Sequence, residues 1–571
     1  MAATLNNPSR NADRLIGWFL LVWTLLNILQ ATTLGLHSDT AYYWIYSRLL
    51  DWGYYDHPPM VAIFIRIGYS LIHQELGVRL MTVLTSTLSM YVLWLIAKRY
   101  KADARWFVLI VPGILIFHIY GFTTTPDAPL LFFTILFYYV YQRYLDRDSW
   151  GIALLLALVI ACLLYSKYHA VLLIFFTLAA NLKLLKRPSF WLIPVLAALL
   201  YVPHILWQIQ HGYPSINYHL FERSSETYDF AHTYLYLPGQ LLMAGPLIGW
   251  FLFYYAWGTR NTDNFTRCLL VNSWGTFLFF LINTLKGNVQ PHWTLIGFVP
   301  LALLVLIRIQ RNQPPKWFYR LAMVNLVVIV AFRLLLAMGL PYIKNLRPVR
   351  SYFGYPEWAR QVHEKVGNAY VIMANGFQEP SKYNYYTRSL KGFSYDARSY
   401  RRTQYDLWPI EDSLQHQRAY YLSTVPLAGI TTDTLHTAKG IYYGTWINDV
   451  RTYQRIDIRI TNYKLSARPR QPLTFNLMLT NPYPFAVDFS NVGQTHPAYL
   501  AACFFQGEEQ TYAQLADSAF NQLKIPAHQT ATYTLHVNAP PKPGKYDLIF
   551  SLRTTPFPGG RNSRIVNFTV Q

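Results

Sequence analysis

The chain has 571 residues, of which 53% are hydrophobic and 13% are charged, about half the charged share of an ordinary soluble domain. This composition argues against a soluble protein and indicates a chain embedded in a lipid bilayer. The formal net charge is +21, but the basic residues stand in short clusters between apolar runs, a pattern typical of membrane topology, so we expect no nucleic-acid partner.

Apolar runs dominate the first part of the chain, and eleven of them are long enough to cross a bilayer as helices. We interpret the first as a retained helix and not a signal peptide, because it is longer than an h-region and "QATTLGL" is a poor cleavage site. The runs lie near 15–34, 78–97, 106–122, 128–142, 150–165, 169–182, 190–208, 238–257, 268–285, 293–308 and 318–340. Several are short, and the two runs within 106–142 could instead form one re-entrant pair.

The connections between these runs alternate in charge. Lys and Arg are concentrated in five connections, at 98–105, 142–148, 183–188, 258–267 and 308–320. Because basic loops stay on the cytoplasmic side, these five connections and the N-terminus are predicted to be cytoplasmic. An odd number of spans then places everything after about residue 341 outside the cytoplasm.

The segment after the last run is polar and has two parts. "PEWARQVHEKVG" predicts a helix, and "AYVIM" and "RAYYL" predict strands, so 343–450 is expected to be a small α/β domain. From 451 to 571, short alternating runs such as "RIDIRI" and "LTFNLML" are separated by turns rich in Pro and Gly, which predicts a β-sandwich. The expected fold class is a polytopic α-helical membrane protein, with its membrane domain over 1–342, followed by these two extracytoplasmic domains.

Ionisable side chains gather in the loops predicted to face outside, close to the span ends. Such groups at membrane depth are costly and by default functional, although any one of them could instead snorkel or cap a helix. A carboxylate there could deprotonate an acceptor hydroxyl, and cations could hold a phosphate leaving group. No glycine-rich nucleotide motif is present, so the set favours transfer from a lipid phosphate. It comprises Asp39, Asp51, Asp56, His57, Glu75, Arg79, Asp127, Lys167, His169, Lys286 and His292.

Several stretches, in this order, resemble the GT-C class of membrane glycosyltransferases, specifically family 39, which includes protein O-mannosyltransferases and the aminoarabinose transferase that acts on lipid A. The resemblance spans about 38–410. It implies a GT-C fold and an inverting transfer from a polyprenyl phosphate. The matching stretches are "SDTAYYWIYSRLLDWGYYDHPPM", "ELGVRL", "TTTPDAPLLFF", "YSKYHAVLL", "KGNVQPHW", "ANGFQEPSKYNYYT" and "YRRTQYDLWP".

The resemblance implies a role for each matching residue. Asp39 corresponds to the catalytic acid and would act as general base on the acceptor, although Thr40 replaces the Glu that usually follows it. The other positions are candidates for substrate binding, and Glu75 with His292 could bind a divalent metal ion. The substrate-binding candidates are Asp127, Glu75, Arg79, Lys167, Lys286, His292, Tyr42, Tyr43, Asp56 and His57.

The absence of the accessory module found in eukaryotic mannosyltransferases favours a bacterial inner membrane and an undecaprenyl-phosphate-linked sugar donor. The acceptor is a glycan, a lipid or a protein. Two alternatives stay open, namely a glycan ligase with a polyprenyl-diphosphate donor and a lipid-linked sugar flippase or transporter. A transporter is expected to show internal repeats and charges deep within its spans, and the sequence has no visible repeat.

Overall fold

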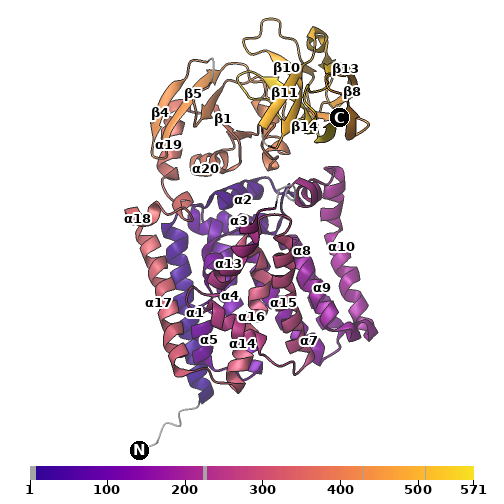
Figure 1. The fold of residues 1–571 in the computed structure, drawn as a ribbon. Coiled ribbons are helices and arrows are strands. Elements are labelled where there is room, and N and C mark those ends of the chain that lie inside the picture. The colour runs from indigo at the N-terminus through magenta and orange to yellow at the C-terminus, as the bar shows by residue number, and fades with distance from the viewer. Residues whose placement is uncertain (1–7, 223–227, 428–429, 508) are drawn as a thin grey trace, which may run out of the picture. The chain divides into compact units, whose positions relative to one another are not determined.

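The computed structural model describes residues 8–222, 228–427, 430–507 and 509–571, and the chain divides into two compact units (Figure 1). The helical unit is Met1–Phe353 and the C-terminal unit is Gly354–Gln571. The helical unit extends past the boundary expected at 342, because Val349 and Tyr352 are buried in one cluster with Leu34, Phe122 and Leu336.

The helical unit contains helices and no strands among its described residues. The α-helices are α1 (Pro8–Thr33), α2 (Ser38–Arg48), α3 (Met60–Leu71), α4 (Glu75–Arg99), α5 (Ala104–Ile110), α6 (Leu115–Phe122), α7 (Asp127–Asp146), α8 (Trp150–Ser166), α9 (Ala170–Ala180), α10 (Pro188–Gln210), α11 (Pro214–Asn217), α12 (Phe230–Tyr234), α13 (Tyr236–Ala244), α14 (Gly249–Trp257), α15 (Asn264–Asn283), α16 (Leu295–Arg311), α17 (Lys316–Met338) and α18 (Pro341–Lys344). Short 3-10 or π turns are η1 (Leu182–Lys186), η2 (Tyr218–Glu222), η3 (Pro291–Thr294) and η4 (Arg350–Tyr352).

Within the part of the chain that the structure describes, six helices are long and apolar enough to cross a membrane, and the number of spans rises to as many as eight if each bent helix pair is counted as one span. The bent pairs coincide with two runs that the sequence treats as single spans. They are α5 with α6, bent by 74°, and the segment Phe230–Ala244 with α14, bent by 93°. Each of the eleven expected runs is helical, but the count of eleven spans stays a prediction. The apolar helix α3 was not expected.

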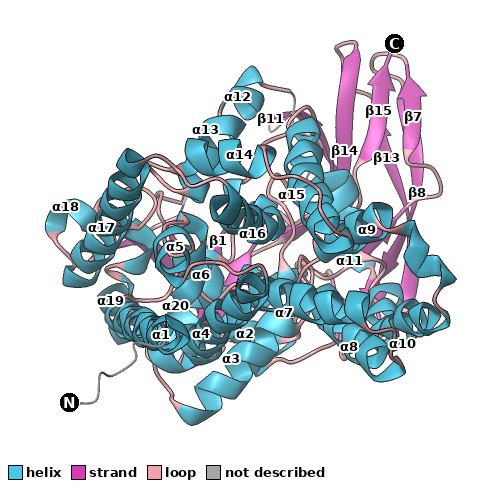
Figure 2. Ribbon diagram, turned by 90° about the horizontal axis from the view of Figure 1, so that it is seen from below, coloured by secondary structure: helices cyan, strands magenta, loops and turns pink. Residues whose placement is uncertain are grey.

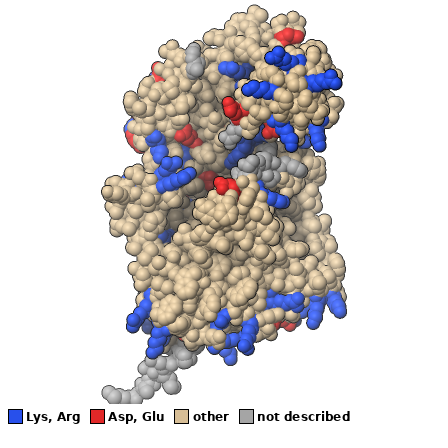
Figure 3. Space-filling model, viewed as in Figure 1, with Lys and Arg blue, Asp and Glu red and all other residues tan. Residues whose placement is uncertain are grey.

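The basic connections meet at one end of the helical unit. Lys98 at the end of α4 lies 3.0 Å from Asp13 of α1. Arg99 pairs with Asp146 of α7, and the Tyr100 hydroxyl donates to Asp263 at the start of α15 at 3.1 Å. On the face shown in Figure 3, Lys and Arg gather at this end, and a broad uncharged band adjoins them. Such a distribution is typical of a multi-pass membrane protein.

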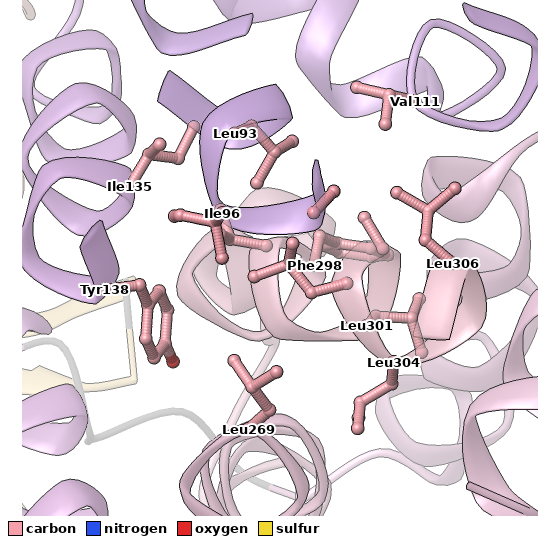
Figure 4. Packing of buried hydrophobic residues seen from close by; sticks show 14 of the residues in the cluster. Leu93, Ile96, Val111, Ile135, Tyr138, Leu269, Phe298, Leu301, Leu304 and Leu306 are labelled. Carbon is pink, nitrogen blue, oxygen red and sulfur yellow. The ribbon is translucent and has the colours of Figure 1, made fainter. Parts of the chain in front are cut away.

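The interior of the helical unit is built around α16. This helix is apolar on every side and is buried over most of its length, as expected for a helix without a polar face. It packs against α4, α5, α7, α14 and α15 (Figure 2). Its Phe298 and Leu301 lie in one hydrophobic cluster with Leu93 of α4, Tyr138 of α7 and Leu269 of α15 (Figure 4).

The C-terminal unit begins with a mixed sheet in the order β2-β1-β3-β5-β4, accompanied by two main helices. Strand β1 is parallel to β2 and to β3, whereas β5 is antiparallel to β3 and to β4. The strands are β1 (Tyr370–Ala374), β2 (Gly392–Tyr395), β3 (Ala419–Ser423), β4 (Asp433–Thr437) and β5 (Gly440–Ile447); the helices are α19 (Tyr355–Val366), α20 (Gln378–Thr387) and α21 (Ile410–Leu414), with η5 (Gln404–Asp406).

The rest of the C-terminal unit is made of strands in two principal sheets, β11-β10-β14-β15-β7 and β13-β8-β6. Alternate residues of the two sheets enclose one core, in which the rings of Phe475 and Phe550 lie 5.2 Å apart. The strands are β6 (Asp457–Arg459), β7 (Lys464–Ala467), β8 (Pro472–Thr480), β9 (Val487–Asp488), β10 (Ala498–Gln506), β11 (Glu509–Leu515), β12 (Lys524–Ile525), β13 (Thr530–Asn538), β14 (Gly544–Thr554) and β15 (Val566–Val570), with η6 (Ser518–Gln522).

A buried carboxylate joins the two parts that the sequence separates at 450. Glu411 of α21 is fully buried. One of its oxygens accepts from the Thr452 hydroxyl at 2.5 Å and from the Gln454 amide at 2.7 Å. The other accepts from the Tyr483 hydroxyl at 2.6 Å. The mixed sheet and the strands after it therefore form a single compact unit.

Candidate active site

The turn between α1 and α2 is held by Arg79. This buried side chain of α4 donates to the carbonyl oxygens of Ala31 at 2.9 Å, Leu34 at 2.6 Å and Gly35 at 2.6 Å. Carbonyls at the end of a helix lack intrahelical partners, so the guanidinium caps α1 and fixes the turn that leads into α2. The sequence suggested Arg79 as a phosphate ligand, whereas three of its hydrogen bonds serve this turn.

Asp39 lies in the first turn of α2, directly after that turn. His37, the residue before α2, caps the helix by accepting from the Asp39 backbone N–H at 3.3 Å. The Asp39 side chain is 43% exposed, and its nearer carboxylate oxygen lies 3.7 Å from His37 Nδ1. A carboxylate in the first turn is favoured by the helix dipole. Asp39 is thus held in place by its backbone while its carboxylate stays accessible.

Asp127, the first residue of α7, and Lys167, which directly follows α8, form a buried ion pair. The Lys167 ammonium lies 2.7 Å from one Asp127 oxygen and 2.9 Å from the other. The two side chains are only 7% and 5% exposed. The sequence assigned both residues to the site as separate candidates, and the structure brings them together across 40 positions of the chain.

Imidazoles surround this ion pair. His57 and His292 lie within electrostatic range of Asp127, and His169 lies within that range of Lys167, His57, His219 and His292. The His57 ring lies 6.4 Å from that of His219. Sequence reasoning did not single out His219, because a lone histidine in a long outer loop carries no distinguishing signal.

Tyrosines connect the ion pair to Asp39. The carboxylates of Asp39 and Asp127 both act on the hydroxyl of Tyr43, and both act on that of Tyr120. The Tyr120 ring lies 6.3 Å from the ring of His292. Asp39 and the Asp127–Lys167 pair therefore border the same polar region.

The remaining acids of the first loop are held by neighbouring side chains. Asp56 is buried and accepts from the Tyr46 hydroxyl at 2.5 Å. Asp51 accepts from the indole N–H of Trp207 at 2.8 Å. Tyr42 and Tyr43 are almost fully buried, and the Tyr43 ring lies 5.7 Å from the ring of His57. These contacts order the loop around the more accessible Asp39.

Three other candidates lie at span ends with different exposure. Glu75 is the first residue of α4 and is half-buried, and His292 is half-buried in η3. Lys286 follows α15 and is exposed. Among the described residues, no group of three or more His, Cys, Asp or Glu side chains could hold a metal ion. A metal site at Glu75 and His292 would therefore need ligands from outside the protein.

Comparison with known proteins places these observations in a family context. Residues 56–207 match the family described as dolichyl-phosphate-mannose-protein mannosyltransferase. That region contains Asp56, His57, Glu75 and the Asp127–Lys167 pair. The chain is 25% identical over 287 residues to the lipid A galacturonosyltransferase RgtD of Rhizobium johnstonii, a match that covers 46% of this chain and 58% of that relative. The match thus spans little more than half of the relative's length.

Solved structures share the fold. ArnT from Cupriavidus metallidurans in the apo state matches with a TM-score of 0.58 and 16% identity, covering 76% of this chain and 98% of ArnT. The same protein bound to undecaprenyl phosphate matches with a TM-score of 0.56 and 16% identity, over 75% and 98% of the two chains. The resemblance to the GT-C class of membrane glycosyltransferases is confirmed, in sequence by the family and the relative and in fold by ArnT.

Proposed function

We propose that this protein is an inverting glycosyltransferase that moves a sugar from a polyprenyl phosphate to an acceptor hydroxyl or phosphate on the periplasmic side of the membrane. The observation that carries the proposal is an accessible carboxylate, Asp39, and a buried Asp127–Lys167 pair, where both acids interact electrostatically with Tyr43 and Tyr120. The likeness to RgtD, and to an ArnT that binds undecaprenyl phosphate, supports a lipid-linked donor.

Asp39 is the proposed general base. Its carboxylate takes the proton from the acceptor oxygen while that oxygen forms a bond to the anomeric carbon. The bond from this carbon to the phosphate oxygen breaks, and the electron pair leaves with the polyprenyl phosphate. Attack from the face opposite the leaving group inverts the anomeric configuration. The accessible carboxylate can approach the acceptor oxygen directly and take its proton as the new bond forms.

Lys167 is the proposed anchor for the leaving phosphate. A lysine ammonium has three donors, and two of its contacts go to Asp127. Asp127 thereby fixes the ammonium, so that its charge stabilises the phosphate without reorganisation. His292 and Lys286 are proposed to assist at the same phosphate. Arg79 is proposed to act indirectly by holding the turn before Asp39, and Tyr42, Tyr43, Asp56, His57 and Glu75 are proposed to shape the sugar site.

The test uses the full chain in nanodiscs with a panel of undecaprenyl-phosphate sugars and an envelope extract as the source of acceptor. We expect Asp39→Asn to lower release of undecaprenyl phosphate by about 100-fold or more while donor binding is retained. Asp51→Asn removes the same charge from the same loop and should leave the rate within a few-fold. Equal release by Asp39→Asn and wild type would refute Asp39 as the base.

We also propose that the N-terminus is cytoplasmic and the C-terminal unit periplasmic, in a bacterial inner membrane. The clustering of Lys and Arg at the end of the helical unit that carries Asp13, Lys98 and Arg99 supports this orientation. Alkaline phosphatase fused after Gln571 is expected to be active in cells, and green fluorescent protein fused at the same place is expected to stay dark. A fluorescent and phosphatase-inactive pair of fusions would reverse the orientation.

A further inference from the structure

One sheet of the C-terminal unit, β11-β10-β14-β15-β7, has a second face that does not close the sandwich core. On β14 the core side is formed by Tyr546, Leu548, Phe550 and Leu552. Because side chains alternate along a strand, the residues between them lie on the opposite face. There Cys503, Phe505 and Ile549 form a small buried apolar cluster. This opposite face is called the outer face below.

Two hollows adjoin on the outer face. One has a volume of about 320 Å³ and the other about 290 Å³. Phe505 lines both hollows, so the two lie next to this residue, and they are together called the groove below. Their sizes are at the lower end of the range for small-ligand sites. The first is lined by Ala397, Arg398, Ser399, Phe505, Gln510 and Pro558.

The groove is polar and its charge is mainly positive. The second hollow contributes Lys545, Asp547 and Asn567. Arg398 lines the first hollow, and Arg553 lies close to it, because a Cβ built at Gly559 would be 2.6 Å from Arg398 Nη1 and 3.4 Å from Arg553 Cβ. Arg561 acts on Asp547, the acid among the residues that line the two hollows. In Figure 3, Lys and Arg gather over the part of this unit that carries β10, β11 and β14.

The backbone makes room for Arg398. Gly559 has a φ of +102°, and a Cβ built there would lie 2.6 Å from Arg398 Nη1 and 2.8 Å from Ser551 Oγ. A side chain at 559 would therefore displace the guanidinium, and the glycine lets it lie against the sheet. Ser551 is fully buried, and its hydroxyl has no hydrogen-bond partner among the described residues. Arg398 thus stands beside an unused buried hydroxyl.

We propose that this groove binds an anionic saccharide, that is, a glycan whose sugars carry carboxylate or phosphate groups. Guanidinium groups bind both kinds of anion through paired hydrogen bonds. The side-chain amides of Gln510 and Asn567 offer donors and acceptors to sugar hydroxyls. That the bound saccharide is the acceptor of the transfer rests on the proposed function, whereas the binding itself does not.

The test measures binding to the full chain in nanodiscs without any sugar donor, so that it is independent of catalysis. The probes are oligoglucuronate, a deacylated lipopolysaccharide core whose charge comes mainly from phosphates, and uncharged maltohexaose. The Arg398→Gln/Arg553→Gln variant removes two cations beside the groove. Arg459→Gln is the matched control, because Arg459 is an exposed cation on β6 of the other sheet.

Wild type, Arg459→Gln and Asp39→Asn are expected to bind at least one anionic probe, with an affinity that falls as salt is raised. The double variant should bind that probe about tenfold more weakly, and maltohexaose should bind far more weakly than the anionic probe. The anionic probe that binds identifies carboxylate or phosphate as the recognised group. Equal affinity of the double variant and wild type, equal affinity for maltohexaose, or no binding of either anionic probe would overturn the proposal. If Asp39→Asn loses transfer but binds the glycan normally, the two functions are separate.

Discussion

At the scale of single residues, the Asp127–Lys167 pair is expected to matter both for the stability of the helical unit and for the proposed transfer. Both side chains are more than nine-tenths buried, so each charge depends on the other for its solvation. Removing one member leaves an uncompensated buried charge, which typically costs about 3–5 kcal/mol. We therefore expect Lys167→Met to lower the unfolding free energy of the helical unit by about that amount, measured by thermal unfolding in nanodiscs.

A double variant separates stability from function at this pair. Asp127→Asn combined with Lys167→Met removes both charges, and we expect it to recover most of the stability lost in the single variant. Release of undecaprenyl phosphate should nevertheless stay low, because the proposed phosphate anchor is gone. Recovery of release together with stability would mean that the pair serves the fold alone.

At the scale of elements, a polar network joins α1, α6 and α17 inside the helical unit. Arg333 of α17 is buried and donates to Gln30 at 3.2 Å and to Asn27 at 2.9 Å, both on α1. Its third side-chain contact is His118 of α6 at 3.0 Å. His118 in turn contacts the Pro112 carbonyl at 2.6 Å, at the bend between α5 and α6. The network holds the bent pair that leads to Asp127.

Arg333→Met is expected to destabilise this junction. Three polar side chains would lose a partner, and side-chain hydrogen bonds within membranes contribute about 0.6 kcal/mol each, so the loss should be about 2 kcal/mol. Thermal unfolding in nanodiscs checks this value. Arg320→Met on the same helix is the control, because Arg320 is exposed and should be nearly neutral. Equal melting temperatures of the two variants would contradict the network's role.

The sequence predicted elements better than it predicted contacts between them. Runs of apolar residues located every long helix, and period-two alternation located β6 and β8, because burial of a face imposes those periods. The short helix α3 was missed, since twelve residues are too few to cross a bilayer and the sequence was scanned for spans. Neither bend was predicted, although 106–142 was open to a re-entrant reading, because the bends depend on packing.

For the candidate site as well, the sequence predicted single residues better than the contacts between them. Asp39, Asp127 and Lys167 could be nominated because ionisable groups stand out at the ends of apolar runs. The pairing of Asp127 with Lys167 could not be predicted, since no local pattern relates positions 127 and 167. Arg79 has the charge expected of a phosphate ligand, but its hydrogen bonds to α1 depend on how α1 and α4 pack. Arg333 looked like an ordinary cation within an apolar run, because sequence alone does not say which side of a span faces lipid.

At the scale of the whole molecule, the C-terminal unit carries buried acids that link its stability to pH. Burial raises the pKa of Glu411 and of Asp396 above their ordinary values, although hydrogen bonds from Thr452 and Tyr483 to Glu411 oppose this effect. A carboxyl group with a raised pKa in the folded state binds its proton more tightly there than in the unfolded chain. Its contribution to stability is therefore fully present below the unfolded pKa of about 4 and is lost as the pH rises through the folded value.

We therefore expect the C-terminal unit to become more stable as the pH falls from neutral toward about 5, opposite to the usual behaviour of salt-bridged acids. Hydrogen exchange of the full chain in nanodiscs, corrected for the intrinsic effect of pH, should show stronger protection of β3, β6 and β8 at the lower pH. Glu411→Gln carries a permanently neutral side chain and should flatten this dependence. Weaker protection at the lower pH in wild type would mean that the ionised form of Glu411, with its three close donors, is the more stable one, and that these hydrogen bonds outweigh burial.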